Sequence, residues 1–257
     1  MTKLLEVRDL VVKRGPRTVV SQVSLTVAAG EVVVVIGPNG AGKSSLISAI
    51  TGDLVPMAGI ARLGDGSVAD MGLREQARRR AVLTQQSAVA FGFTVLEVVS
   101  MAREPWRDLS SAAEDARVVS EAMQATDVTH LAMRPVQALS GGEQARVAIA
   151  RTIAQATALL IWDEPTAALD VRHQLMVMRG LQEHAAAGGG ALVVLHDLTL
   201  ASQIADRIVI LKEGRLFASG PPMQVLTTDI LTSAYEAQFL VQHMPGQALA
   251  VIPRLTS

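Results

Sequence analysis

Uninterrupted apolar runs mark the centre of a predicted parallel sheet. They are Val32 to Ile36, Ala158 to Trp162 and Ala191 to Leu195. A strand buried on both faces has this pattern, because neither face can carry polar side chains. Ala81 to Gln85 is a further predicted strand, and it ends in a glutamine. Helical patterns separate the runs, so we expect a parallel α/β sheet with ligands at the carboxyl ends of its strands.

Two segments depart from this alternation. Residues 3–12 and 18–27 alternate apolar and polar positions, which predicts antiparallel strands with a turn at residues 13–16. Between Ser87 and Gln155 the pattern becomes helical, with a capping box at Ser111 and Glu114. Val119 and Met123 have the spacing of a helix core face. Four arginines between residues 74 and 80 are interpreted as a solvated helix face.

The predicted organisation is a single domain over residues 1–257. Its core spans residues 1–86 and 157–240, a helical insert spans 87–156, and a C-terminal tail spans 241–257. A net charge of −1 disfavours a general nucleic-acid-binding surface. The absence of cysteine excludes disulfides, thiolate zinc sites and cysteine nucleophiles. The first ten residues are too charged for a signal peptide, and no apolar stretch reaches the roughly 20 residues of a membrane-spanning helix.

A glycine-rich loop over residues 37–44 follows the first apolar run. Its sequence, GPNGAGKS, fits the pattern G-x-x-x-x-G-K-[ST], in which backbone N–H groups converge on phosphate oxygens. The helix that follows directs its positive end at the same place. A plain glycine-rich turn is the alternative, but the strand before and the helix after favour nucleotide binding. The predicted nucleotide-binding residues of this loop and helix are Asn39, Gly40, Gly42, Lys43, Ser44 and Ser45.

A pair of carboxylates, Asp163 and Glu164, ends another apolar run. Beside a phosphate-binding loop, Asp163 is expected to hold Mg²⁺ together with the Ser44 hydroxyl. Glu164 is then placed to polarise a water molecule for attack on the γ-phosphorus. An ordinary acidic turn before Pro165 is the alternative, and the loop at residues 37–44 decides against it.

A second candidate phosphate cradle opens the helix after Leu139. Ser140 and Glu143 form a capping box around Gly141 and Gly142. A helix that starts with glycine N–H groups and a serine hydroxyl is also an anion site. Because residues 37–44 already provide one cradle, the second makes sense if it serves a nucleotide held by another copy of the chain.

The order of these motifs resembles that of ABC-type ATPase subunits over nearly the whole chain. The motifs are GPNGAGKSS, Gln85, LSGGEQ, IWDEP, the Ala168-Leu169-Asp170 loop and His196. The resemblance implies a P-loop NTPase (RecA-like) parallel core with an antiparallel β subdomain and an inserted helical subdomain. It also implies a homodimer that closes head to tail on two ATP molecules, with residues 140–143 of one copy facing the other copy's P-loop.

By the same resemblance, Glu164 is the general base, His196 is the γ-phosphate contact and Gln85 senses Mg²⁺ and the attacking water. Asp170 is expected at the dimer seam. Arg14 occupies the place where an adenine-stacking aromatic is usual, and a guanidinium can also stack on a base. Ala168 replaces a frequent serine, which is expected to leave Asp170 with one fewer local hydrogen-bond partner.

A finer resemblance is to importers of iron chelates and cobalamin, and within them to haem (hemin) importer ATPases. It rests on residues 91–99, 101–105, 196–201 and 251–254. It implies that the partners are integral-membrane permease subunits and, indirectly, a substrate-binding protein, and that nucleic acid is not a partner. It also implies that the chain is a peripheral protein on the cytoplasmic face of the inner membrane. Ferric siderophore or cobalamin import is the nearest alternative. A soluble ABC ATPase acting on DNA or ribosomes is the alternative of another class, and the low basic charge disfavours it.

Overall fold

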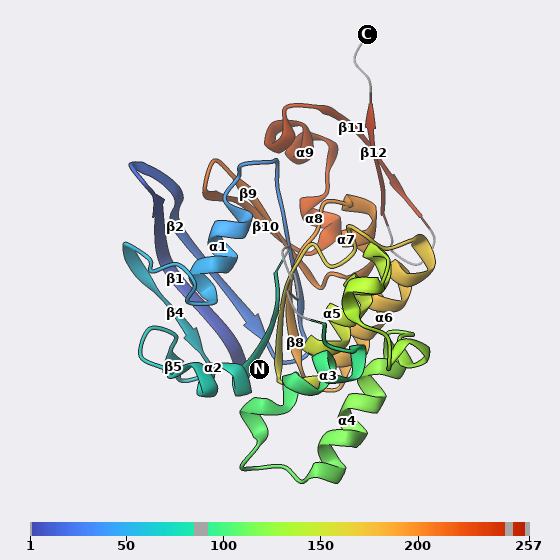
Figure 1. Cartoon of the computed structure of the whole chain (residues 1–257). Helices are drawn as coiled ribbons and strands as arrows, with labels where there is room; N and C mark the ends of the chain where they lie inside the picture. The colour runs from blue at the N-terminus through green and yellow to red at the C-terminus, as the bar shows by residue number, and fades with distance from the viewer. Residues whose placement is uncertain (1, 85–91, 245–248, 255–257) are drawn as a thin grey trace.

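The computed structural model describes residues 2–84, 92–244 and 249–254. A six-stranded central sheet runs through the middle of the molecule, with strand order β10-β9-β3-β8-β7-β6 (Figure 1). Its strands are β3 (Val32–Ile36), β6 (Arg80–Leu83), β7 (Leu159–Asp163), β8 (Gly190–Val194), β9 (Arg207–Lys212) and β10 (Arg215–Gly220).

The sheet is parallel except at one edge, as the apolar runs predict. β3 pairs in parallel with β8 and β9, β7 pairs with β8 and β6, and only β10 runs antiparallel to its neighbour. Every residue of β3, β7 and β8 is buried. The carboxyl ends of five strands therefore meet at one edge of the sheet, where the candidate site residues follow them.

A four-stranded antiparallel sheet forms the predicted β subdomain. Its strands are β1 (Lys3–Arg14), β2 (Arg17–Ala28), β4 (Ala58–Leu63) and β5 (Gly66–Ser67). Helix α1 (Lys43–Ile50) contacts β1, β2 and β7, so the helix after the glycine-rich loop is packed between the two sheets. One buried apolar cluster joins both sheets to this helix.

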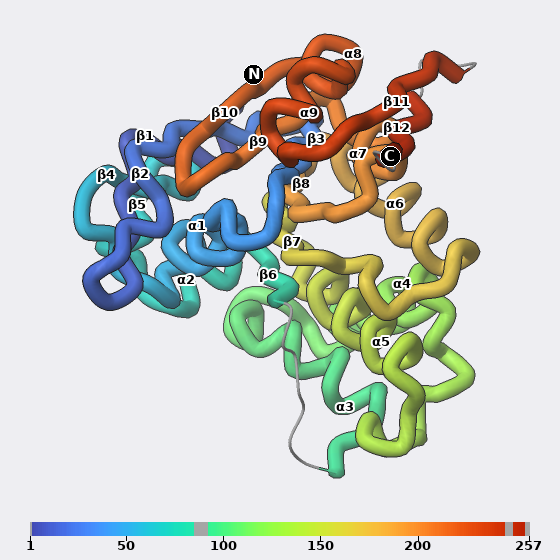
Figure 2. Tube along the Cα trace, turned by 90° about the horizontal axis from the view of Figure 1, so that it is seen from above, coloured from blue at the N-terminus to red at the C-terminus, as the bar shows by residue number. Residues whose placement is uncertain are grey.

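The helical insert has its own core and lies on the side away from the antiparallel sheet (Figure 2). Val119 and Met123 are buried in that core, which confirms the interpretation of their spacing. Ser111 accepts a hydrogen bond from Glu114 N and caps α4, which is one half of the predicted capping box; the return hydrogen bond to the Glu114 side chain is not formed. The elements are α3 (Val95–Ser100), η1 (Met101–Trp106), α4 (Ala112–Ala125), η2 (Thr129–Leu131), η3 (Val136–Ala138) and α5 (Gly141–Ala154).

The predicted solvated arginine face is wrong for three of its four members. Three of the four arginines lie in helix α2 (Leu73–Arg79) and the fourth, Arg80, starts β6; of the four, only Arg74 is exposed. The other three guanidinium groups are partly buried and donate to backbone carbonyls: Arg78 to Pro105 O, Arg79 to Leu63 O and Arg80 to Thr51 O. The acceptors come from distant segments, so a pattern read along the helix could not indicate them.

The C-terminal part ends in an antiparallel hairpin of β11 (Gln238–His243) and β12 (Leu249–Arg254). Ser202 of α7 hydrogen-bonds Leu249 O at 2.9 Å and anchors the hairpin to the core. The predicted start of the tail at residue 241 therefore falls inside β11. The remaining helices are α6 (Val171–Ala186), α7 (Leu198–Ile204), α8 (Pro222–Val225) and α9 (Thr228–Tyr235). None of the helices in the described residues combines the length and apolar character needed to cross a bilayer.

Candidate nucleotide-binding and hydrolysis site

A pocket of about 780 Å³ lies at the carboxyl end of β3, between the glycine-rich loop, the β1–β2 hairpin and the ends of β7 and β8. It brings together nine of the residues that the sequence predicts to bind or hydrolyse a nucleotide. They are Arg14, Asn39, Gly40, Gly42, Lys43, Ser44, Ser45, Glu164 and His196. Arg17 also lines the pocket and was missed by the sequence reasoning, although it pairs with Arg14 across the hairpin.

Two glycines of the loop are required by the closeness of the neighbouring backbone. A Cβ on Gly37 would lie 2.2 Å from Leu211 O, and a Cβ on Gly42 would lie 2.3 Å from Val19 O. Both residues also have positive φ angles, 148° and 98°, which glycine adopts without strain. The loop is thus held between β2 and β9, and residues 39–45 line the pocket.

Lys43 folds back over the loop that precedes it. Its Nζ donates hydrogen bonds to Gly37 O at 2.7 Å and to Pro38 O at 3.1 Å. Burial lowers the pKa of Lys43, and the nearby carboxylates of Glu164 and Asp163 oppose that shift. A phosphate would replace the two carbonyl acceptors and would match the positive charge better than they do.

Asp163 is the buried acid of the pair, with 5% of its surface exposed. Burial raises the pKa of Asp163, while a hydrogen bond with the Ser44 side chain opposes that shift. Its Oδ1 is buried without a hydrogen-bond partner among the described residues. A carboxylate oxygen and a hydroxyl side by side are ligands that Mg²⁺ accepts, so the residues present fit this ion. No group of three or more His, Cys, Asp or Glu residues in the described part of the chain could hold a metal. Nucleotide phosphates and water would have to complete the coordination.

Glu164 is held by contacts from the neighbouring strand. Its φ of 55° is positive, a conformation that non-glycine residues adopt at a cost in free energy. Its backbone N–H donates to Val194 O at 3.1 Å, and its Oε1 lies 2.5 Å from Nε2 of His196. The predicted base and the predicted γ-phosphate contact are therefore hydrogen-bonded to each other. Gln85 lies outside the described residues.

The second candidate phosphate cradle does not line this pocket. Ser140 caps α5, and its backbone N–H and its Oγ both donate to Oε2 of Glu143 at 2.7 Å. The side-chain hydrogen bond from Ser140 lowers the pKa of Glu143. None of residues 140–143 lines the pocket, and Ser140 and Gly141 are exposed. The fold therefore does not bring the two cradles of one chain together, as expected if they serve different nucleotides.

Asp170 caps α6 and has a partner that the sequence reasoning missed. It accepts hydrogen bonds from the backbone N–H of His173 at 2.9 Å and from His173 Nδ1 at 2.8 Å. The bond from the backbone N–H lowers the pKa of Asp170. Because Ala168 replaces a frequent serine, Asp170 was expected to have one fewer local hydrogen-bond partner. His173 is a local partner that this expectation did not consider. The spacing of an Asp three residues before a His at a helix start could have indicated it.

A phosphate-binding loop after one parallel strand, a carboxylate pair after a second and a histidine after a third define a P-loop nucleotide-binding protein. Comparison with known proteins supports the same class. Residues 20–167 match the ABC transporter family. The hemin import ATP-binding protein HmuV of Nocardia farcinica is 50% identical over 255 residues, covering 97% of this chain and 88% of that protein. HmuV of Thermobifida fusca is 46% identical over 251 residues, covering 98% and 88%.

A similar fold is seen in the solved dimeric structure of a post-hydrolysis state of an ATP-binding cassette bound to ADP and Pi. The two share a TM-score of 0.77 and 25% identity over 85% of this chain and 98% of that one. The chain belongs to the ABC transporter family. Its nucleotide is ATP, and its enzymatic activity is ATP hydrolysis coupled to transport.

Proposed function

We propose that this chain is the ATP-hydrolysing subunit of a hemin importer. The observation that carries the proposal is the near-full-length identity of 46–50% to hemin import ATP-binding proteins, combined with a pocket that gathers nine predicted site residues. The same role in ferric siderophore or cobalamin import is the second candidate.

The working form is a head-to-tail homodimer in which each ATP lies between two copies. Ser140 and Gly141, at the start of α5, are exposed and lie outside their own chain's pocket. In the proposed dimer, Ser140, Gly141 and Gly142 of one copy contact the γ-phosphate held by Lys43 of the other. Asp170 would lie at the seam between the copies.

Hydrolysis is proposed to use the residues at the strand ends. Lys43 exchanges its two carbonyl acceptors for phosphate oxygens, and Arg14 stacks on the base. Ser44 and Asp163 would hold Mg²⁺, which supplies charge neutralisation on the phosphates when bound. His196 exchanges its hydrogen bond to Glu164 for one to the γ-phosphate, and the released Glu164 carboxylate accepts a proton from the attacking water. Gln85 is proposed to report the state of this site to the insert.

A groove between α2 and η1 is the proposed contact with the permease. It has a volume of about 660 Å³ and is lined in part by Leu73 and Met101, which are 85% and 47% exposed. Arg74, Glu104 and Asp108 supply charges of both signs around these apolar side chains. Such a groove fits a short amphipathic helix. We therefore propose that a cytoplasmic helix of an integral-membrane permease binds here, which makes this chain peripheral to the cytoplasmic face of the membrane.

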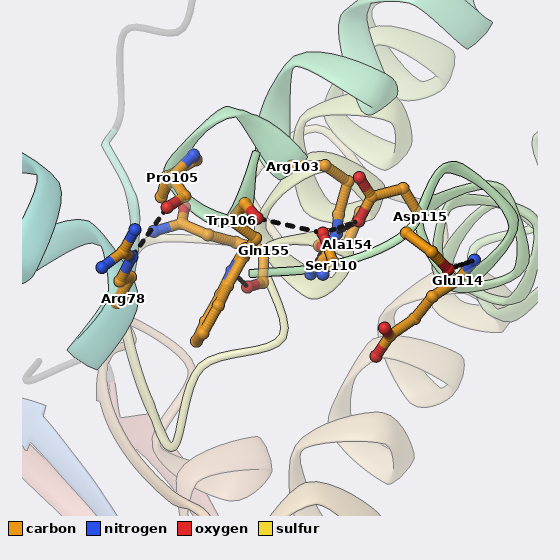
Figure 3. A network of polar contacts seen from close by, with 10 residues as sticks. Arg78, Arg103, Pro105, Trp106, Ser110, Glu114, Asp115, Ala154 and Gln155 are labelled. Carbon is orange, nitrogen blue, oxygen red and sulfur yellow. Dashed lines mark hydrogen bonds and ion pairs between the residues drawn. The ribbon is translucent and has the colours of Figure 1, made fainter. Parts of the chain in front are cut away.

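A polar network connects this groove to α5, the helix capped by Ser140. Arg78 Nε donates to Pro105 O at 2.7 Å, which ties the groove wall to α2. Figure 3 shows Trp106 between Arg78 and Arg103, whose guanidinium carbons lie 5.9 Å and 5.6 Å from the ring centroid. Trp106 Nε1 then donates to Gln155 O at 2.8 Å, immediately after the end of α5. A displacement of η1 would therefore be transmitted to the C-terminal end of α5.

The predicted division into a core, a helical insert over 87–156 and a C-terminal tail is retained in this proposal. The insert would move with the permease, and the core would hold the nucleotide. A substrate-binding protein would act indirectly, by delivering hemin to the permease.

The test is transport in proteoliposomes that contain this chain and a candidate hemin permease from the same organism. We expect ATP-dependent uptake of hemin in excess over ferric siderophore and cobalamin, and no uptake with the Lys43→Ala chain. Preferential uptake of cobalamin or siderophore would replace hemin by the second candidate. ATP hydrolysis that no permease stimulates would contradict the importer role.

A further inference from the structure

A second pocket, of about 610 Å³, lies at the seam between the insert and the core, and it shares no lining residue with the nucleotide pocket. Its walls come from β7 and α6 of the core and from α4 and α5 of the insert. The volume is in the range of sites that hold a drug-sized organic molecule. Neither the phosphate chemistry nor the proposed permease groove uses this pocket.

One residue of the pocket lining has a buried polar group with no hydrogen-bond partner in the described part of the chain. Trp162 lines the pocket with only 1% of its surface exposed, and its neighbour on the same face of β7, Leu160, lines it as well. The Trp162 indole Nε1 is buried without a hydrogen-bond acceptor among the described residues. A buried donor left unpaired is unfavourable, and the indole N–H can only donate. A ligand with an acceptor atom at this depth would remove that penalty.

A glycine in the middle of α6 keeps the space open. Gly180 lines the pocket, and a Cβ built on it would meet no atom within 4 Å. Its backbone is helical and needs no positive φ, so the conformation does not require glycine. Glycine inside a helix is less stable than alanine. Neither the backbone conformation nor a close neighbour requires glycine at position 180. We therefore explain the glycine by the pocket volume that a larger side chain would fill.

The rim of the pocket can receive a negative charge. Arg172 and Arg179 lie there, and among the described residues Arg172 has only a distant ion pair with Asp127, at 3.6 Å. Arg179 has no ion-pair partner within the described part of the chain. His184 is held by Ala158 O at 3.2 Å, and Glu183 is the one acid on the lining. The cationic groups therefore outnumber the acid around an apolar interior.

We propose that this pocket binds an amphipathic organic carboxylate. The apolar body would contact Ile153, Val177 and the open side of Gly180, an acceptor atom would meet the Trp162 N–H, and the carboxylate would pair with Arg179. Because the walls belong to both the core and the insert, a bound molecule would bridge the two. Two sources supply the apolar body and the carboxylate. One is a porphyrin dicarboxylate, which rests on the proposed function because hemin is one, and which has a second carboxylate as a further acceptor for the Trp162 N–H. The other is a fatty acid from the membrane, which would pair with Arg179 but would leave the Trp162 N–H without an acceptor.

The test is calorimetric titration of the full chain with protoporphyrin IX and, separately, with decanoate. We expect saturable submillimolar binding of at least one probe. Gly180→Leu should weaken binding by about tenfold or more by filling the pocket, whereas the matched Gly180→Ala variant should change it by about threefold or less. Arg179→Gln should weaken protoporphyrin IX but leave its dimethyl ester unchanged. As a control, each variant should bind ATP with the affinity of the parent chain, which would show that the nucleotide pocket is intact.

Binding of protoporphyrin IX alone would identify the porphyrin source, and binding of decanoate alone the fatty acid source. Equal binding by the parent and Gly180→Leu chains, or saturable binding of neither probe, would overturn the proposal. In that case hemin uptake in proteoliposomes would still stand as a separate result, so a failed pocket is distinguishable from a failed importer.

Discussion

His196 Nε2 lies 2.5 Å from Glu164 Oε1, although the two residues are 32 positions apart in the sequence. They follow adjacent parallel strands, β7 and β8, in which Asp163 pairs with Val194. The sheet register therefore places them opposite each other at one edge. In the proposed mechanism, His196 would have to exchange this hydrogen bond for one to the γ-phosphate before the Glu164 carboxylate is released to act as the base.

Replacement of Glu164 by glutamine should separate ATP binding from hydrolysis. Glutamine keeps the size of the side chain and can still hydrogen-bond His196, but it cannot accept a proton from water. We expect nucleotide affinity close to that of the parent and a hydrolysis rate lower by about 10²–10⁴-fold. Phosphate release measures the rate. Glu121→Gln, on an exposed face of α4, is the control, and parent-like turnover by Glu164→Gln would mean that another group is the base.

Mixed dimers test the proposed sharing of each site between two copies. Lys43→Ala should abolish ATP binding in its own pocket, and Ser140→Arg should block the exposed loop that serves the partner. Each variant alone should be inactive. A mixture should recover activity in the heterodimers, because one of their two sites keeps both Lys43 and Ser140. If every mixing ratio stays inactive while both variants fold and dimerise, the sites are not shared.

Trp106 should act on coupling to the permease and not on the chemistry of hydrolysis. Trp106→Phe keeps a ring between Arg78 and Arg103 but removes the hydrogen bond to Gln155 O, which is worth about 1 kcal/mol. We expect basal ATPase activity to stay unchanged and the permease-stimulated increase to fall by about fivefold. Arg117→Gln, which breaks only an exposed ion pair on α4, is the matched control. An equal loss of basal and stimulated activity would contradict the role in coupling.

Tyr235 should make the fold sensitive to alkaline pH. Burial raises the pKa of Tyr235 from 10.0 to about 12, and a hydrogen bond with the backbone of Gly37 opposes that shift. Between these two values the unfolded chain loses the phenol proton and the folded chain retains it. The free energy of unfolding should therefore fall as the pH rises through this window, by at most about 3 kcal/mol.

The chain contains one tyrosine, so tyrosinate absorbance reports this group alone. The Tyr235→Phe variant should lose less free energy of unfolding than the parent as the pH rises through this window. Urea unfolding of both chains at matched pH values measures the difference. If the tyrosinate absorbance of the folded parent chain rises with a midpoint near pH 10, the fold does not stabilise the protonated phenol, and the prediction is wrong.

The parts of the site that lie within one segment could be predicted from the sequence. The apolar run at Val32–Ile36 and the glycine loop after it are local patterns, and their strand–loop–helix structure is set by sterics and burial over a few residues. The same holds for the Ser140–Glu143 capping box. The meeting of Glu164 and His196 at one edge also followed, because parallel strands place their carboxyl ends together.

Contacts between distant segments were decided only by the tertiary structure. The partial burial of Arg78 beside Pro105 and the hydrogen bond from Trp106 to Gln155 join residues 27 and 49 positions apart. No local pattern encodes such a pair, because the same side chain would be solvated if the acceptor were elsewhere. The seam pocket beside Gly180 is of this kind as well: the sequence supplies a glycine in a helix, and only the packing of α6 against the insert turns it into a space.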